Sequence, residues 1–446
     1  MKFTTRRNTW AMLLAGASLT ALTVQSANAA FFALREQSAY SQGASFAGAS
    51  AQVNALSSSF FNPAIITEFS GLTLEGTLSG ILPFTDAETS VAGGNIGNPV
   101  VDGTRAVAIG ARQTTDNVGK KALVPGSYAS YQINEKFWAG FAVNAPFGLG
   151  TRSEPGSLEA LSSQEFSALS FNFQPTVAYK VNERFSLAVG LQVQYIQVEQ
   201  SANQLTGANV ELNAEDVSFG ALAGVTIKPT DKTVIGIGYR SQMDVDLDGT
   251  TTLRNNGGVP GFDVDLGPAS ADLALPDIVN VGISHRFTER FTGLAQFSWE
   301  NWSRLQSVSV INGAGATAAE FEFNLSDSFF YAIGGEFEAT DHLKLRAGIA
   351  YETSPTNDQD RSLALADNNR LWFSAGGTVK LLKHIENDFA FTWVRVEGDT
   401  VVGNRFQSGT TVAGSALPLP LQGANIASGT ANSNVFIISA GSRIRF

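Results

Sequence analysis

The C-terminal end of the chain alternates between two kinds of side chain and finishes on an aromatic residue, Phe446. The two alternating sets are Phe436, Ile438, Ala440, Ser442, Ile444 and Phe446, and Val435, Ile437, Ser439, Gly441, Arg443 and Arg445. A period of two puts each set on one face of a strand. A strand with one apolar face and a terminal aromatic residue is typical of a bacterial outer-membrane β-barrel. Closed barrels, like helices, satisfy every backbone polar group inside a membrane.

Residues 1–29 are predicted to be a signal peptide. Lys2, Arg6 and Arg7 form a basic start, 10–24 is a short apolar stretch, and 27–29 (Ala-Asn-Ala) is a small-x-small cleavage site. The apolar stretch is shorter than the roughly 20 residues that a transmembrane helix needs. Cleavage removes three positive charges from a chain of net charge −11, which leaves −14. We therefore expect no nucleic-acid partner and no basic lipid-binding surface.

Residues 71–446 are predicted to form an all-β, fourteen-stranded antiparallel transmembrane β-barrel. The expected strands are 71–82, 121–133, 136–146, 166–180, 184–200, 216–228, 232–246, 272–287, 290–304, 320–338, 342–352, 370–382, 386–396 and 433–446. Six short turns alternate with seven long loops, at 83–120, 147–165, 201–215, 247–271, 305–319, 353–369 and 397–432. An even number of strands, with short periplasmic turns and long outer loops, is the usual layout of such barrels. A large soluble all-β protein is the alternative.

Repeated alternation supports lipid on one face of the sheet. In 184–200, for example, Phe185, Leu187, Val189, Leu191, Val193 and Tyr195 alternate with Ser186, Ala188, Gly190, Gln192 and Gln194. Aromatic residues near strand ends predict the two interfacial girdles of a membrane barrel: Phe137, Trp138, Tyr239, Trp299, Trp302, Tyr351 and Trp372. Glycines within strands, such as Gly236, Gly238 and Gly376, predict bends or a close approach by something inside the barrel.

Residues 30–70 do not have a strand pattern. They are rich in small and polar residues, with apolar side chains such as Phe46, Leu56 and Ile65 among them. Because a barrel of this strand number is wide enough to leave a passage, we expect 30–70 to form an N-terminal hatch, or plug, inside the lumen. The alternative is a flexible periplasmic tail.

The sequence Asn62-Pro63-Ala64, after this small-residue segment, resembles the hatch motif of the FadL family of outer-membrane long-chain fatty acid transporters. Further stretches are similar in kind: 275–277 (Leu-Pro-Asp), 298–303 (Ser-Trp-Glu-Asn-Trp-Ser), 351–355 (Tyr-Glu-Thr-Ser-Pro) and 367–376. The resemblance covers 30–446 and implies uptake of hydrophobic molecules. It makes Phe60, Phe61, Asn62, Pro63 and Ala64 the predicted hatch or gate.

The resemblance also implies a kink in the third strand that opens the wall laterally toward the bilayer. In this chain that strand ends in Pro146, Phe147, Gly148, Leu149 and Gly150, and proline and glycine both weaken a strand ladder. An ordinary strand end is the alternative. Apolar residues near this point, Leu149, Leu158 and Leu161, are candidates for an outer ligand groove.

The sequence departs from the family where the fatty-acid carboxylate is expected to bind. The family implies basic side chains near the end of the fifth strand and before the tenth, but 194–200 and 320–327 contain no lysine or arginine. Either other cations serve, with Arg152, Arg240, Arg346 and Arg370 as candidates, or the ligand is a neutral hydrocarbon, aromatic compound or ester. Each arginine has the alternative role of an ion pair in the lumen.

Two other functional classes remain to be compared. A hydrolase needs a histidine base near the outer rim, but His285, His342 and His384 fall at the predicted short turns. A general diffusion porin would lack the plug. We therefore predict a non-enzymatic transporter of the bacterial outer membrane, without cofactor or metal. Its expected partners are a fatty acid or other hydrophobic molecule, outer-membrane lipid with lipopolysaccharide, and the barrel-assembly machinery during biogenesis.

Overall fold

A computed structural model describes residues 32–90, 112–115, 118–153, 165–203, 209–255, 261–358, 361, 367–398, 400–405 and 425–446. The predicted signal peptide lies outside these residues. Within them no helix has the length and hydropathy needed to cross a membrane.

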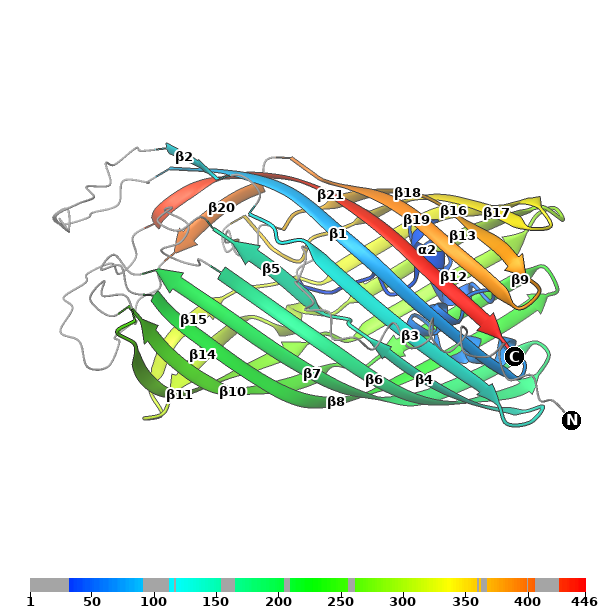
Figure 1. The fold of residues 1–446 in the computed structure, drawn as a ribbon, viewed down its shortest axis with the longest axis horizontal. Coiled ribbons are helices and arrows are strands. Elements are labelled where there is room, and N and C mark those ends of the chain that lie inside the picture. The colour runs from blue at the N-terminus through cyan, green and yellow to red at the C-terminus, as the bar shows by residue number, and fades with distance from the viewer. Residues whose placement is uncertain are drawn as a thin grey trace, which may run out of the picture.

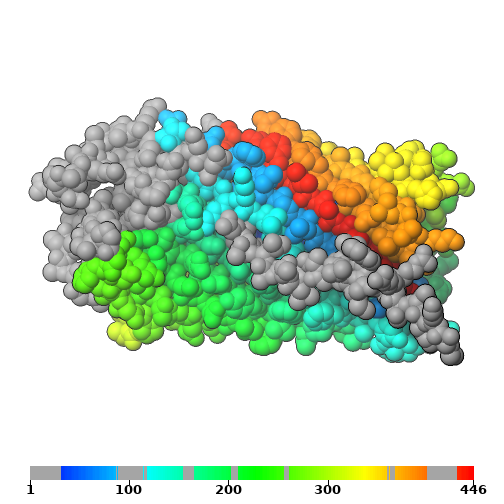
Figure 2. Space-filling model, in the orientation of Figure 1, coloured from blue at the N-terminus to red at the C-terminus, as the bar shows by residue number. Residues whose placement is uncertain are grey.

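The described strands form a closed antiparallel barrel of fourteen strands, which confirms the predicted fold class (Figure 1). Eight are continuous: β1 (Leu72–Ser90), β3 (Ala122–Gln132), β6 (Glu165–Asn182), β7 (Phe185–Asn203), β8 (Asn209–Thr230), β17 (Leu343–Glu352), β18 (Arg370–Leu382) and β21 (Asn425–Arg445). The barrel closes where β1 pairs with β21 from Thr73 opposite Arg445 to Ser90 opposite Ser428. These first and last strands lie side by side on the surface (Figure 2).

The other six strands are each interrupted. The pairs of pieces are β4 (Phe137–Asn144) with β5 (Gly148–Arg152), β9 (Thr233–Arg240) with β10 (Met243–Arg254), β11 (Val264–Leu275) with β12 (Ile278–Arg286), β13 (Phe291–Glu300) with β14 (Ser307–Asn312), β15 (Thr317–Glu322) with β16 (Ser328–Thr340), and β19 (Ile385–Val396) with β20 (Thr400–Arg405). A short helix, η6 (Trp302–Arg304), lies in the fourth of these interruptions, and β2 (Arg112–Thr115) pairs with the far end of β1.

The face of the barrel wall that carries the apolar side chains changes along the barrel axis, from the outer face in one half to the inner face in the other. In the half nearer the short turns, exposed apolar side chains such as Val189, Ile333 and Ile438 face outward, as the alternation predicted. In the other half, Met243, Val245 and Leu247 of β10 are buried in the bore, while Asp244, Asp246 and Asp248 face outward. A wall that is apolar outside suits hydrocarbon, and one that is polar outside suits water. The strands therefore continue beyond the bilayer on the side of the long loops.

This extension corrects several predicted loop boundaries. β7 and β8 reach 203 and 209, so that most of the predicted loop 201–215 is strand. Likewise β14 and β15 pair within the predicted loop 305–319, and β1 continues to Ser90. The predictions were wrong there because a strand with a polar outer face loses the membrane pattern.

The segment 32–69 lies within the barrel and is almost entirely buried, and we call it the luminal segment. It contains one turn of α-helix and three short 3-10 helices: α2 (Ala39–Gln42), η1 (Ala49–Ala51), η2 (Leu56–Phe60) and η3 (Pro63–Glu68). Figure 1 shows α2 behind the strands of the wall. Small side chains let the segment pack closely, since Ala44, Ala49 and Ala64 are completely buried.

Strand glycines make room for the luminal segment, as the sequence predicted. A Cβ atom on Gly236 would overlap the Ser50 carbonyl oxygen, and one on Gly238 would overlap that of Phe61. Side chains at these wall positions are incompatible with the observed position of the segment.

Three of the predicted girdle aromatics point inward instead. Trp138 donates to the Phe69 carbonyl (2.8 Å), Trp372 packs against Phe46, and Trp302 is completely buried. By contrast, Phe137 and Tyr239 are exposed on the outer face, as expected.

Candidate functional site

At the predicted kink of the third strand, backbone pairing between neighbouring strands of the barrel wall is interrupted. Ala122–Gly126 of β3 pair with β1 on one side, but the described residues of β4 and β5 do not pair with them on the other. The ladder resumes beyond the break, where the Lys120 amide donates to the Gly150 carbonyl at 3.0 Å. We call residues 145–147 (Ala-Pro-Phe), between β4 and β5, the wall break. Proline at its centre has no amide to donate.

The start of the luminal segment pairs with the wall break from inside. The Leu34 amide donates to the Pro146 carbonyl, and the Gly148 amide donates to the Phe32 carbonyl, both at 2.8 Å. Ala33 thereby lies opposite Phe147 in an antiparallel bridge. Backbone groups that the missing ladder leaves free are satisfied by the luminal segment.

Gln37 spans the opening. Its side-chain amide donates to the Ala145 carbonyl at 2.7 Å and accepts from the Ala145 amide at 3.3 Å. Its backbone carbonyl accepts from the Tyr128 hydroxyl of β3 at 2.8 Å. Gln37 is completely buried, and these bonds connect β3, at the edge of its unpaired stretch, to the wall break through the luminal segment.

Three aromatic rings meet where the luminal segment enters the wall break. Ring centroids lie 4.8 Å apart for Phe32 and Trp302, and 5.8 Å apart for Phe32 and Phe147. These rings belong to a larger set of buried apolar side chains on the extracellular side, which we call the upper apolar cluster. It comprises Phe32, Ala33, Phe147, Leu149, Ala168, Ile196, Ala214, Met243, Val245, Leu247, Ala269, Ala271, Leu275, Trp302, Leu305, Val310 and Leu325.

Arg35 fixes the luminal segment to the opposite wall. Its guanidinium pairs with Glu300 at 2.5 Å and with Glu352 at 2.9 Å, and it lies 4.2 Å from the centre of the Phe330 ring. All three charged side chains are buried. Removing one member of a buried ion pair costs about 3–5 kcal/mol, so that this contact strongly restrains the segment.

The predicted hatch motif secures the other end of the segment. The Asn62 side chain caps η3 by accepting from the Ala64 amide (3.1 Å), and Pro63 occupies the first helical position. The Asn62 amide nitrogen also donates to the Ser50 carbonyl (2.9 Å) and to the Val225 carbonyl of β8 (3.0 Å). Asparagine supplies the acceptor and the two donors together, which explains its place in the motif. Phe60 and Phe61 are both buried.

The four candidate arginines are dispersed. Arg152 is exposed and pairs with Glu165 at 2.8 Å, Arg346 pairs with Asp388 at 3.2 Å, and Arg370 pairs with Asp367. Arg240 is buried beside Phe60. Of the candidate groove residues, Leu149 is buried in the upper apolar cluster, whereas Leu158 and Leu161 lie outside the described residues.

Sequence reasoning missed Arg35, Gln37 and the inward position of Trp302. A signal existed for the first of these, because Arg35, Glu36 and Glu68 are the only charged residues in 30–70. A lone cation in a segment expected to be buried implies an acidic partner.

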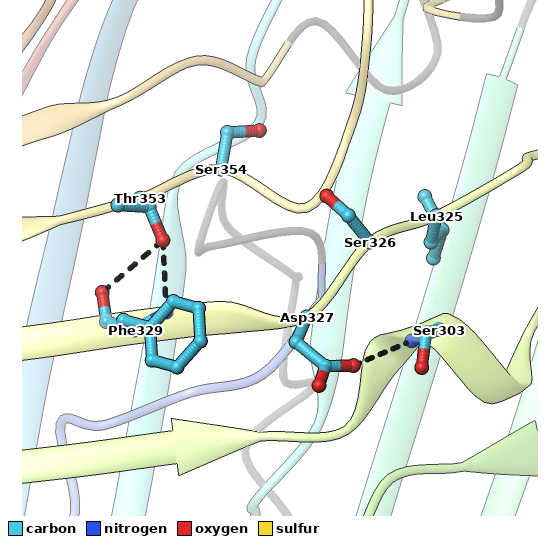
Figure 3. A pocket seen from close by; sticks show the side chains of 7 residues that line it. All are labelled: Ser303, Leu325, Ser326, Asp327, Phe329, Thr353 and Ser354. Atoms are coloured by element: carbon cyan, nitrogen blue, oxygen red, sulfur yellow. Dashed lines mark hydrogen bonds between the residues drawn. The ribbon is translucent and has the colours of Figure 1, made fainter.

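A surface pocket of about 660 Å³ lies at the extracellular ends of β16 and β17, with Leu325 of the upper apolar cluster among its lining residues (Figure 3). Its one carboxylate, Asp327, accepts from the Ser303 amide (3.2 Å) and the Trp299 indole (2.8 Å). Those bonds occupy the group that could hold a ligand. No described cluster of side chains has the composition of a metal site.

Comparison with known proteins shows one consistent relationship. The sequence matches the family described as "Outer membrane protein transport protein (OMPP1/FadL/TodX)" over residues 20–446. It is 28% identical to outer membrane protein P1 of Haemophilus influenzae (86% of this chain, 89% of that protein). It is 23% identical to the long-chain fatty acid transport protein of Escherichia coli K12 (81% and 87%).

Two solved structures have the same fold. A Pseudomonas aeruginosa FadL homologue is 21% identical, with a TM-score of 0.79 over 94% of this chain and all of that one. The Pseudomonas putida toluene transporter TodX is 15% identical, with a TM-score of 0.63 over 92% and 98%.

Proposed function

Because this chain belongs to the OMPP1/FadL/TodX family, and is thus a bacterial outer-membrane transporter of hydrophobic compounds, we propose that it takes up long-chain fatty acids or related molecules. Some relatives are named for long-chain fatty acids and others for toluene, so that ionised fatty acids and neutral hydrocarbons are the two candidate substrate classes. The observation that carries the proposal is the upper apolar cluster, which lines the bore above the bilayer and reaches the wall break through Phe32, Phe147 and Trp302.

The proposed path avoids water. Transfer of a long acyl chain from an apolar surface to water costs roughly 0.8 kcal/mol per CH₂, so an aqueous pore is a poor route. The substrate first enters the upper apolar cluster. The luminal segment, acting as a hatch, then rearranges at residues 60–64, and the substrate leaves sideways at the wall break, near Pro146, Phe147, Gly148 and Gly150. Contacts with lipopolysaccharide and with the barrel-assembly machinery accompany this role.

Uptake by intact cells tests the proposal. The chain, expressed in a bacterium that lacks its own long-chain fatty acid porin, should restore uptake of radiolabelled oleate, and toluene uptake is measured in parallel. Restoration of toluene uptake alone favours the neutral-hydrocarbon alternative. A large, steady conductance in planar bilayers with no selective uptake would instead establish a diffusion porin.

Asn62→Ala is expected to alter uptake kinetics without preventing barrel assembly. The substitution removes the cap of η3 and the bonds to Ser50 and Val225, and an N-cap substitution alone costs about 1 kcal/mol. We expect the initial rate of oleate uptake to change several-fold, while heat-dependent electrophoretic mobility reports a folded barrel. Wild-type uptake in this variant would mean that the motif has no part in gating.

A further inference from the structure

Within the described part of the chain, almost all buried lysine and arginine side chains have an acidic partner. Seven described lysine and arginine side chains are buried: Arg35, Arg240, Lys344, Arg346, Arg361, Arg370 and Arg443. Six of them pair with a carboxylate: Arg35 with Glu300, Lys344 with Glu336, Arg346 with Asp388, Arg361 with Asp358, Arg370 with Asp367, and Arg443 with Glu75. Arg240 is the exception within the described part of the chain.

Neutral groups surround Arg240 instead. Its guanidinium lies 4.4 Å from the centre of the Phe60 ring and 3.5 Å from the Phe60 carbonyl oxygen. With the Gln174 amide turned so that its oxygen faces the guanidinium, that oxygen is 2.6 and 2.7 Å from the two terminal nitrogens. A buried charge held by neutral dipoles alone is costly, which makes the site favourable for an anion.

The position of Arg240 suits the head group of an amphiphile. It ends β9, and β10 begins at Met243, so that the same wall continues from the cation into the upper apolar cluster. Met243, Val245 and Leu247 then line the bore toward the extracellular side at ~3.3 Å per residue. On the other side Arg240 touches Phe60 of the luminal segment. The cation thus lies between an apolar lining and the predicted gate.

We infer that Arg240 binds the carboxylate of a long-chain monocarboxylic acid whose tail lies in the upper apolar cluster. A guanidinium offers two parallel donors to a carboxylate, and no other described buried cation is without an acidic partner. Because the guanidinium rests on Phe60, a carboxylate bound there also alters a contact that holds the luminal segment. The inference rests on the proposed transport of hydrophobic molecules, and it selects an ionised substrate over a neutral hydrocarbon.

Binding of a matched acid and alcohol tests this assignment. The protein in lipid nanodiscs is incubated with hexadecanoate or with 1-hexadecanol, and bound ligand is quantified against empty nanodiscs. Arg240→Gln should weaken hexadecanoate binding about tenfold or more, since the charge-assisted hydrogen bonds between the guanidinium and the carboxylate are lost. Hexadecanol binding should change less than about threefold, because the apolar contacts remain.

Two further variants make the result interpretable. Arg240→Lys keeps the charge and should retain most of the affinity for hexadecanoate. If Arg240→Gln fails to fold, the lysine variant still tests whether the binding follows the positive charge, because loss of hexadecanoate affinity in a folded Arg240→Lys protein contradicts the assignment. Arg254→Gln removes an exposed arginine paired with Glu211 and should leave both ligands unaffected. Unchanged hexadecanoate affinity in Arg240→Gln overturns the assignment while the transport proposal stands. Failure of the wild-type protein to bind either ligand overturns the transport proposal itself.

Discussion

Uptake of oleate should stop when positions 33 and 147 are joined by a disulfide, and it should return on reduction. Ala33 and Phe147 face each other in an antiparallel bridge. The flanking bonds, from the Leu34 amide and from the Gly148 amide, identify it as a non-hydrogen-bonded pair. Such pairs bring Cα atoms to ~4.5 Å, which lies within the range that a disulfide spans.

The double variant Ala33→Cys, Phe147→Cys therefore fixes the start of the luminal segment across the wall break. If substrate leaves through this opening, the covalent link blocks both the movement of the segment and the exit. Because the chain contains no cysteine, the engineered pair has no competing thiol. Cells are assayed for oleate uptake before and after treatment with a membrane-permeant reductant.

The two single-cysteine variants are the controls for this experiment. Phe147→Cys alone removes a ring that contacts Phe32, so that its uptake sets the baseline for the loss of packing. Neither single variant should respond to reductant. Full uptake by the oxidised double variant, with the disulfide verified by mass spectrometry, would show that substrate does not need this opening.

The parts of the fold that lie in the bilayer were predictable because every strand there must place apolar side chains on its outer face, at every second residue. β18 begins and ends as expected at 370 and 382, and the outward face of β7 carries the predicted apolar residues. Above the bilayer that rule no longer applies. In β10, three aspartates face water and apolar residues face the bore, and the sequence pattern there resembles a polar loop.

The candidate site was predictable only where a motif is local. The capping geometry of Asn62, Pro63 and Ala64 arises within three residues, and the proline of the wall break weakens its own strand. Contacts of Arg35 with Glu300 and Glu352 join residues hundreds of positions apart, and a single sequence contains no pairing information of that kind. Similarly, the interruption after Glu300 turns Trp302 inward, and strict alternation could not anticipate it.

Gly236→Val is expected to displace the luminal segment and to open the bore to hydrophilic solutes. A Cβ at this position would overlap the Ser50 carbonyl oxygen and lie 2.9 Å from the Asn62 amide nitrogen. Gly236 is paired on both sides, with Thr226 of β8 and Gly282 of β12. The wall is therefore the more rigid partner, and the segment has to move. Overpacking of this kind costs about 1–3 kcal/mol or more.

Single-channel conductance in planar bilayers should rise several-fold over the wild-type protein, and limited proteolysis should cleave within 32–69. Gly76→Val is the matched control, since Gly76 is also a strand glycine but a Cβ there meets nothing within 4 Å. Its conductance should equal that of the wild type. Both variants should show the heat-dependent mobility of a folded barrel. A folded Gly236→Val barrel with wild-type conductance would mean that some part of the molecule other than the luminal segment closes the bore, because fourteen strands enclose more space than their own inward side chains fill.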